Sequence, residues 1–169
     1  MRIKLIAYFL TVAGILSLLT ACSSKLEESA GTKKDESTHT FHAENGDMRE
    51  LTKSNEVLPD FLNEKPEQMQ IIYGAAAKHK DLLEAIPCYC GCGESGAHRD
   101  NYDCFVYENK QSGEIVWDDH GTRCGVCLET AAESIIQYKD GKSVKEIRQY
   151  IDDKYKEGYA EPTPTPFPS

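Results

Sequence analysis

Apolar side chains recur every three or four residues in three stretches of the chain, which is the spacing of a helix with one buried face. The first stretch begins at Pro66, a residue suited to the opening position of a helix, and continues to Ile86. The second begins near Cys124 and stops at a glycine turn after residue 139. In the third, Ser143 and Glu146 have the spacing of a capping box. The pattern therefore predicts three amphipathic helices.

The segment between the first two helices has a different pattern. It is rich in cysteine, and it contains two short apolar runs, 104–107 and 114–117, on either side of a polar, glycine-containing stretch. Such a pair of runs forms either a loop or a small β-hairpin. The predicted fold class is therefore mainly α, with three amphipathic helices. A cysteine-rich loop lies between the first and second helices, and the same segment either contains a small β-hairpin or does not.

The first 21 residues have the pattern of an export signal. Arg2 and Lys4 precede an apolar run, 5–19, which is too short to span a bilayer comfortably. The run closes on Leu-Thr-Ala-Cys22, which resembles the bacterial lipobox. We expect cleavage before Cys22, acylation of that cysteine with palmitate or a similar chain, and tethering to the outer face of the cytoplasmic membrane. The alternative is an ordinary secretory signal or a short anchor that ends near a cysteine.

The remaining chain divides by composition. Residues 22–56 are dominated by Ser, Lys, Glu, Thr, Asp and Gly, and they predict a flexible tether, because such a segment buries too little surface to offset its ordering entropy. Residues 57–159 carry the helices and the cysteines and predict one cysteine-rich domain. Residues 160–169 alternate proline with other residues and predict a disordered tail.

The charge of the chain restricts its partners. The formal net charge is −9, and removal of Arg2 and Lys4 with the leader would make the rest more acidic still. This negative charge argues against nucleic acid as a partner and against binding to anionic lipid through a polybasic segment. The expected partners are the membrane, through the lipid anchor, and an extracytoplasmic metalloenzyme.

Cysteine is the residue type that most strongly indicates a function. Of the seven cysteines, six lie between residues 88 and 127, together with two histidines. Soft sulfur ligands and imidazoles at this density predict a metal centre. The candidate metal ligands are Cys88, Cys90, Cys92, His98, Cys104, His120, Cys124 and Cys127.

The spacing supports a shared ion at the second helix. Cys124 and Cys127 are three residues apart at the start of that helix, where two sulfurs lie on one side and the helix terminus favours the thiolate. His120 lies one turn earlier, and Asp118 or Asp119 could orient its ring. Reduced thiolates and alternating cysteines suit low coordination numbers, so copper, as Cu(I), is expected ahead of zinc.

Two alternatives remain open. An exported domain with six cysteines besides Cys22 could be a disulfide-stapled interaction module, although adjacent cysteines in Cys88-x-Cys90 cannot bridge without strain. Cys124 and Cys127 also have the Cys-x-x-Cys spacing of a thiol–disulfide oxidoreductase, but no strand is predicted after them, as a thioredoxin-like fold requires. No hydrolytic or phosphate-binding motif is present, so no catalytic residue is assigned and no enzyme activity is expected.

Several of these motifs also resemble one family. Pro87 to Cys92 reads Pro-Cys-Tyr-Cys-Gly-Cys, and the segments Asp103–Val106, Trp117–Cys127 and Lys145–Ile151 are similar to those of the PCYCGC-motif lipoproteins of Gram-positive bacteria. The likeness covers roughly residues 65–159. It implies a lipid-anchored location and a role for the cysteines, and it implies neither an activity nor a particular metal.

Overall fold

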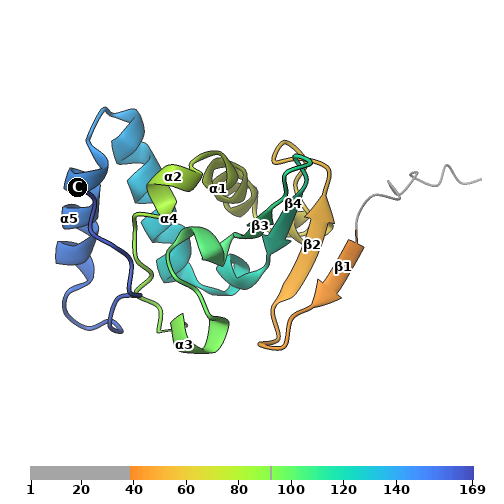
Figure 1. The fold of residues 1–169 in the computed structure, drawn as a ribbon, viewed down its shortest axis with the longest axis horizontal. Helices are drawn as coiled ribbons and strands as arrows, with labels where there is room; N and C mark the ends of the chain where they lie inside the picture. The colour runs from red at the N-terminus through yellow and green to blue at the C-terminus, as the bar shows by residue number, and fades with distance from the viewer. Residues whose placement is uncertain (1–38, 92) are drawn as a thin grey trace, which may run out of the picture. The chain divides into compact units, whose positions relative to one another are not determined.

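Two hairpins build a four-stranded antiparallel sheet. The computed structural model describes residues 39–91 and 93–169, and its strands are β1 (His39–His42), β2 (Met48–Thr52), β3 (Val106–Asn109) and β4 (Ile115–Asp118). Their order in the sheet is β1-β2-β4-β3 (Figure 1). The fold is therefore a mixture of helix and sheet, and the prediction of a mainly α protein is wrong.

The strand that joins the two hairpins was missed because its buried positions are polar. In β2 the side chains of Glu50 and Thr52 point inward and are fully buried. The Glu50 carboxylate accepts hydrogen bonds from the backbone N–H groups of Asp60 and Phe61, at 2.6 and 3.3 Å. The Thr52 hydroxyl accepts one from Trp117 Nε1 at 2.9 Å. A strand of this kind shows no apolar alternation, which is the signal used to find strands.

The first hairpin corrects the extent of the expected tether. Residues 39–52 lie within the 22–56 segment, yet they form β1 and β2. Their turn contains Asn45 and Gly46; Gly46 has a φ of 85°, and the Asn45 side chain accepts from the Asp47 N–H at 3.1 Å. Asn-Gly is a strong hairpin signal that the low apolar content concealed. Residues 22–38 and the leader, including Cys22, lie outside the described residues.

The three expected helices are present. The first is divided at His79 into α1 (Glu67–Lys78) and α2 (Lys80–Leu83), and the others are α4 (Gly125–Lys139) and α5 (Val144–Tyr155). The capping box of Ser143 and Glu146 is formed in full. Among the described residues no helix is both long and apolar enough to cross a membrane. Shorter turns complete the fold: η1 (Asp60–Leu62), α3 (Gly93–Gly96), η2 (Tyr102–Cys104) and η3 (His120–Arg123).

Helix α1 connects the sheet to the other helices. It packs on α4, which packs in turn on α5 at the end away from the sheet (Figure 1). Its fully buried Tyr73 meets Phe105 edge-on, with ring centroids 5.0 Å apart, and donates a hydrogen bond to the Asp118 carbonyl at 3.0 Å. Cys88 in the loop after α2 and Cys127 at the start of α4 belong to the same hydrophobic core as Tyr73.

The proline-rich tail is also part of the packed structure. Thr163 and Thr165 are buried, and the Arg148 guanidinium donates hydrogen bonds to the carbonyls of Thr165 and Pro166. The composition predicted a disordered tail, because prolines form no core of their own. Here the tail instead lies on groups that other segments provide, which composition alone does not reveal.

Candidate metal centre

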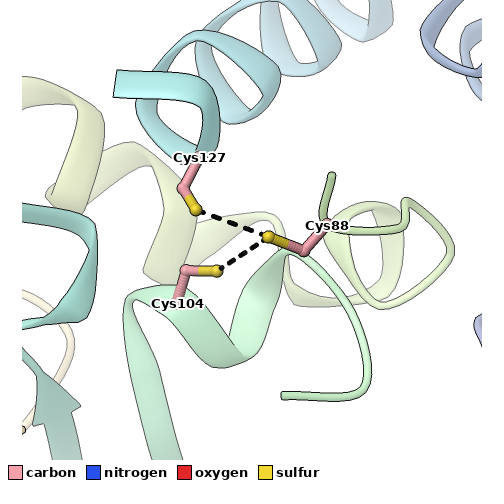
Figure 2. A group of neighbouring side chains, drawn as sticks. All are labelled: Cys88, Cys104 and Cys127. Carbon is pink, nitrogen blue, oxygen red and sulfur yellow. Dashed lines mark hydrogen bonds between the residues drawn. The ribbon is translucent and has the colours of Figure 1, made fainter. Parts of the chain in front are cut away.

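Three segments that are distant in the sequence bring three sulfur atoms together. Cys88 lies in the loop after α2, Cys104 ends η2, and Cys127 lies in the first turn of α4. Their side chains point toward one another (Figure 2). The Cys88 sulfur is 3.5 Å from that of Cys127 and 3.7 Å from that of Cys104, and all three atoms lie within 4.8 Å of one another. We refer to these residues as the three-sulfur group.

These separations match those of sulfur ligands on one ion. Thiolates at about 2.3 Å from a tetrahedral zinc lie about 3.8 Å apart, and a trigonal arrangement needs a similar spacing. The group is therefore able to hold a metal ion with small side-chain adjustments. Cys88 is 2 % exposed and the other two sulfur side chains are fully buried within the hydrophobic core.

A second group of three sulfurs shares one member with the first. Cys90, Cys124 and Cys127 also place their sulfur atoms within 4.8 Å of one another. Cys124 is the N-cap of α4, and its sulfur accepts from the Cys127 N–H at 3.4 Å. Cys90 is disulfide-bonded in the structure, so it would become a thiolate ligand only after reduction. We refer to these three residues as the second sulfur group.

A complete disulfide framework does not form, although Cys90 is disulfide-bonded. Four of the described cysteines are free thiols: Cys88, Cys104, Cys124 and Cys127. Because four of the six cysteines are unbridged, three disulfide bonds are impossible. The domain instead has a core of aliphatic and aromatic side chains that surrounds the thiols.

Hydrogen bonds between the thiols give them different pKa values. The pKa of Cys88 falls to about 3, because the Cys104 thiol and then the Cys127 thiol hydrogen-bond to its sulfur. The pKa of Cys127 is raised by hydrogen bonds with Cys104, Cys124 and Cys88, and by burial. For Cys104, hydrogen bonding to Cys127 lowers the pKa, but its bond to Cys88 and burial outweigh this effect and raise it. Negative charge therefore gathers in a buried place where a cation would neutralise it.

The tail holds the Cys88 backbone from both sides. The Cys88 N–H donates to the Thr163 hydroxyl at 2.9 Å, and the Thr163 N–H donates to the Cys88 carbonyl at 3.0 Å. One residue further, the Ala160 N–H donates to the Tyr89 carbonyl at 3.3 Å. The segment 160–163 thus fixes the start of the cysteine loop against the core.

The two histidines do not join the sulfur atoms around one ion. The His98 ring lies beside the three-sulfur group, with Nδ1 3.5 Å from the Cys104 sulfur. Its other edge faces away, toward His120, and the two rings are perpendicular with centroids 4.4 Å apart. His98, His120 and Asp47 form their own group, with one ligand atom from each within 4.8 Å of the others. We call this group the histidine–carboxylate pocket.

Asp47 is the member of this pocket that the sequence did not predict. Its carboxylate lies 3.3 Å from His120 Nδ1, whereas Asp118, expected to orient that ring, accepts from the His120 backbone N–H at 2.9 Å. Asp119 accepts from the Met48 N–H. Asp47 was assigned to the tether, and the Asn-Gly turn before it was the one signal that could have placed it in a fold.

Of the eight metal-ligand candidates, the structure describes seven. Five are cysteines of the two sulfur groups, and His98 and His120 belong to the histidine–carboxylate pocket. Cys92 lies outside the described residues.

Fold and site together define an α/β protein with a buried cluster of cysteine side chains that could hold a metal ion. A family model described as "Protein of unknown function with PCYCGC motif" matches residues 11–168, and the chain belongs to that family. No curated protein and no solved structure matches the chain.

Proposed function

We propose that the buried thiols bind Cu(I), and that the protein handles or delivers copper outside the cytoplasm. The observation that carries this proposal is the convergence of three free thiols, Cys88, Cys104 and Cys127, on one point inside the core. Thiolate ligands select soft ions such as Cu(I) over harder cations.

The number of sulfurs favours copper over zinc. Structural zinc sites are almost always four-coordinate, whereas three thiolates are sufficient for Cu(I). The fourth free thiol, Cys124, approaches Cys127 but is not within the three-sulfur group. Burial among apolar side chains also keeps water from completing a zinc coordination sphere.

The shared sulfur of Cys127 gives the protein a capacity for two ions. In the oxidised form only the three-sulfur group is complete as thiols, because Cys90 is disulfide-bonded. Reduction of that disulfide would complete the second sulfur group, with Cys127 as a bridging thiolate. The amount of bound copper would then depend on the redox state of Cys90.

The test is an anaerobic Cu(I) titration of the purified full chain against a Cu(I) chelator that competes for the metal. One ion is expected without reductant, and two after treatment with a phosphine. The matched control is Cys22→Ser, which changes a cysteine outside both sulfur groups and should leave the stoichiometry unchanged. Zinc bound in preference to Cu(I), or no retention of Cu(I) against the chelator, would overturn the proposal.

The location and the partner belong to the same proposal. An anchored protein could pass copper to an extracytoplasmic metalloenzyme, or protect the cell surface from excess copper. The leader pattern that ends at Cys22 supports acylation and attachment to the outer face of the cytoplasmic membrane. Cells that express Cys22→Ser should incorporate no radiolabelled palmitate into the protein. Continued labelling of this variant would contradict the anchor.

One observation favours thiol–disulfide exchange as a second candidate. Cys124 is partly exposed at a helix N-terminus, and its pKa falls to about 6 because of its hydrogen bond with Cys127, which outweighs burial. A partly exposed thiolate with a buried neighbour is the arrangement of an attacking and a resolving cysteine. Against it, the sheet is antiparallel throughout and no strand follows α4 in the described chain.

One experiment distinguishes copper binding from thiol–disulfide exchange. In an exchange enzyme, the Cys124 thiolate attacks a substrate disulfide, one substrate sulfur leaves as a thiolate, and Cys127 then resolves the mixed disulfide. Cys127→Ser should therefore trap substrates on Cys124 if exchange is the function. In the copper protein the same variant traps nothing, and copper protects Cys124 of the reduced wild-type protein from iodoacetamide.

A further inference from the structure

The histidine–carboxylate pocket has the composition of a second metal site, different in kind from the sulfur groups. Asp47, His98 and His120 offer two imidazoles and one carboxylate. Such nitrogen and oxygen ligands suit divalent ions of intermediate hardness rather than Cu(I), and two histidines with one carboxylate are a recurring set for zinc and iron.

One buried ring nitrogen of the pocket has no hydrogen-bond partner. The His98 side chain is 3 % exposed, and its Nε2 has no hydrogen-bond partner. The nearest acidic atom is Asp47 Oδ2 at 4.0 Å, which is too far for a hydrogen bond. Buried polar atoms in proteins are nearly always satisfied, so an unsatisfied one that faces a carboxylate and a second imidazole calls for an occupant.

The ring is held in this orientation from several sides. Nδ1 lies 3.5 Å from the Cys104 sulfur, which leaves Nε2 for the pocket. Gly96 packs against the ring so closely that a Cβ there would lie 3.1 Å from Nε2. Metal-binding histidines commonly use the second ring nitrogen in such a supporting contact, which fixes the ring for coordination.

The charges around the pocket also favour a cation. Three carboxylates, of Asp47, Asp118 and Asp119, place one oxygen each within 4.8 Å of the others. Two guanidinium groups neutralise two of these three negative charges: Arg49 pairs with Asp118, and Arg123 pairs with both Asp47 and Asp119. One negative charge is left over. The Arg123 side chain is 49 % exposed, so it is able to swing into solvent when an ion takes its place at Asp47.

We infer that Asp47, His98 and His120 bind a divalent transition-metal ion of intermediate hardness, such as Zn²⁺, at a site separate from the sulfur groups. Three protein ligands leave one position of a tetrahedral ion for water or a further ligand. Because His98 contacts Cys104, this site and the three-sulfur group are adjacent, and His98 is the residue through which occupancy of one would affect the other.

The experiment uses Co²⁺ as a spectroscopic probe for the divalent ion. The full chain carrying Cys127→Ser lacks the sulfur shared by both sulfur groups, so it isolates the pocket. We expect one equivalent of Co²⁺, with visible d–d absorption and without the near-ultraviolet sulfur-to-cobalt charge-transfer bands. Absence of Co²⁺ binding in this background, or charge-transfer bands on binding, overturns the inference.

Substitutions in the same background identify the ligands. Asp47→Asn and His120→Ala should each weaken Co²⁺ binding at least tenfold, as loss of even a supporting contact costs about 10–100-fold. Asp119→Asn is the matched control, because it also breaks an ion pair of Arg123 but removes no member of the pocket. If Asp119→Asn weakens binding as much as Asp47→Asn, the acidic cluster binds the ion and the inference fails.

A gain in affinity cannot result from misfolding, so Arg123→Gln gives an independent check. Removal of the competing guanidinium should tighten Co²⁺ binding by about fivefold, the equivalent of a partly exposed ion pair. Unchanged or weaker binding would count against a cation at Asp47. The Cu(I) titration of the wild-type protein is separate from these measurements, so copper binding and this second site can fail independently.

Discussion

The three-sulfur group and the histidine–carboxylate pocket touch at one point and otherwise have opposite surroundings. Cys88, Cys104 and Cys127 are members of the hydrophobic core. Asp47, His98 and His120 lie in a network of carboxylates and guanidinium groups beside the sheet. The Cys104 sulfur contacts His98 Nδ1 and so joins the two groups.

This difference shows how one small domain separates two kinds of ligand. An apolar surrounding strengthens soft sulfur coordination and excludes water, whereas a charged surrounding stabilises a harder divalent ion through its net negative charge. The separation depends on the side chains that each secondary-structure element presents: the starts of α4 and of the cysteine loop face the core, and the β1–β2 turn supplies the carboxylate.

The largest expected effect comes from removing the sulfur that both sulfur groups share. Cys127→Ser should weaken Cu(I) binding at least about 100-fold, since loss of a ligand exceeds the loss of a supporting contact. Cys124→Ser is the matched variant, and it should cost only the second copper of the reduced protein. Competition with a chelator measures both. Equal losses in the two variants would mean that the three-sulfur group is not the primary site.

Removal of the tail should affect the sulfur side of the comparison more than the histidine–carboxylate pocket, because the tail holds the Cys88 backbone by two hydrogen bonds and the Arg99 carbonyl by one. A stop after Tyr159 deletes the two hydrogen bonds between Thr163 and the Cys88 backbone and those from Arg148 to the tail. We expect a loss of about 2 kcal/mol in unfolding free energy, because each of these four bonds is worth about 0.5 kcal/mol, at the lower end of the usual range. Urea unfolding measures the loss.

A finer version of this test keeps the tail and changes one hydroxyl. Thr163→Val removes the acceptor for the Cys88 N–H, and alkylation of Cys88 should become faster. Co²⁺ binding at the histidine–carboxylate pocket should be unaffected by this change. If cobalt binding falls as much as Cys88 protection does, the tail stabilises both sites, and the two sites are not structurally separate.

Gly96→Ala should disturb the pocket and leave the sulfur groups intact. The new Cβ would lie 3.1 Å from His98 Nε2, so the ring must shift by a few tenths of an ångström. We expect a cost of about 1 kcal/mol in stability and weaker Co²⁺ binding, with Cu(I) binding close to that of the wild-type protein. Gly125→Ala is the control, because a Cβ there meets nothing within 4 Å.

The smallest expected effect concerns the backbone that leads into His98. Ala97 has a φ of 54°, in the left-handed region that side chains other than glycine disfavour. Ala97→Gly should therefore change stability in the favourable direction, by less than about 1 kcal/mol. Ala132→Gly, within α4, should instead destabilise by about 1 kcal/mol. A destabilising Ala97→Gly would show that Ala97 makes contacts that outweigh the strain.

The sequence alone determined the elements whose signals are local. The capping box of Ser143 and Glu146, the proline before α1 and the apolar periodicity placed the helices, because these features depend on residues a few positions apart. The density of cysteines between residues 88 and 127 also identified the region of the candidate site, and the PCYCGC motif identified the family.

Only the tertiary structure decided which of those residues act together. Strand β2 buries the polar side chains of Glu50 and Thr52, whose partners lie outside the strand, so apolar alternation did not reveal it, although the runs 104–107 and 114–117 had indicated the second hairpin. The sulfur of Cys127 meets that of Cys88 across 39 positions, and the Asp47 carboxylate meets the His120 ring across 73. Spacing in the sequence fixes distances within one helix or turn, whereas the packing of separate elements fixes distances between them, and both candidate sites are formed by packing.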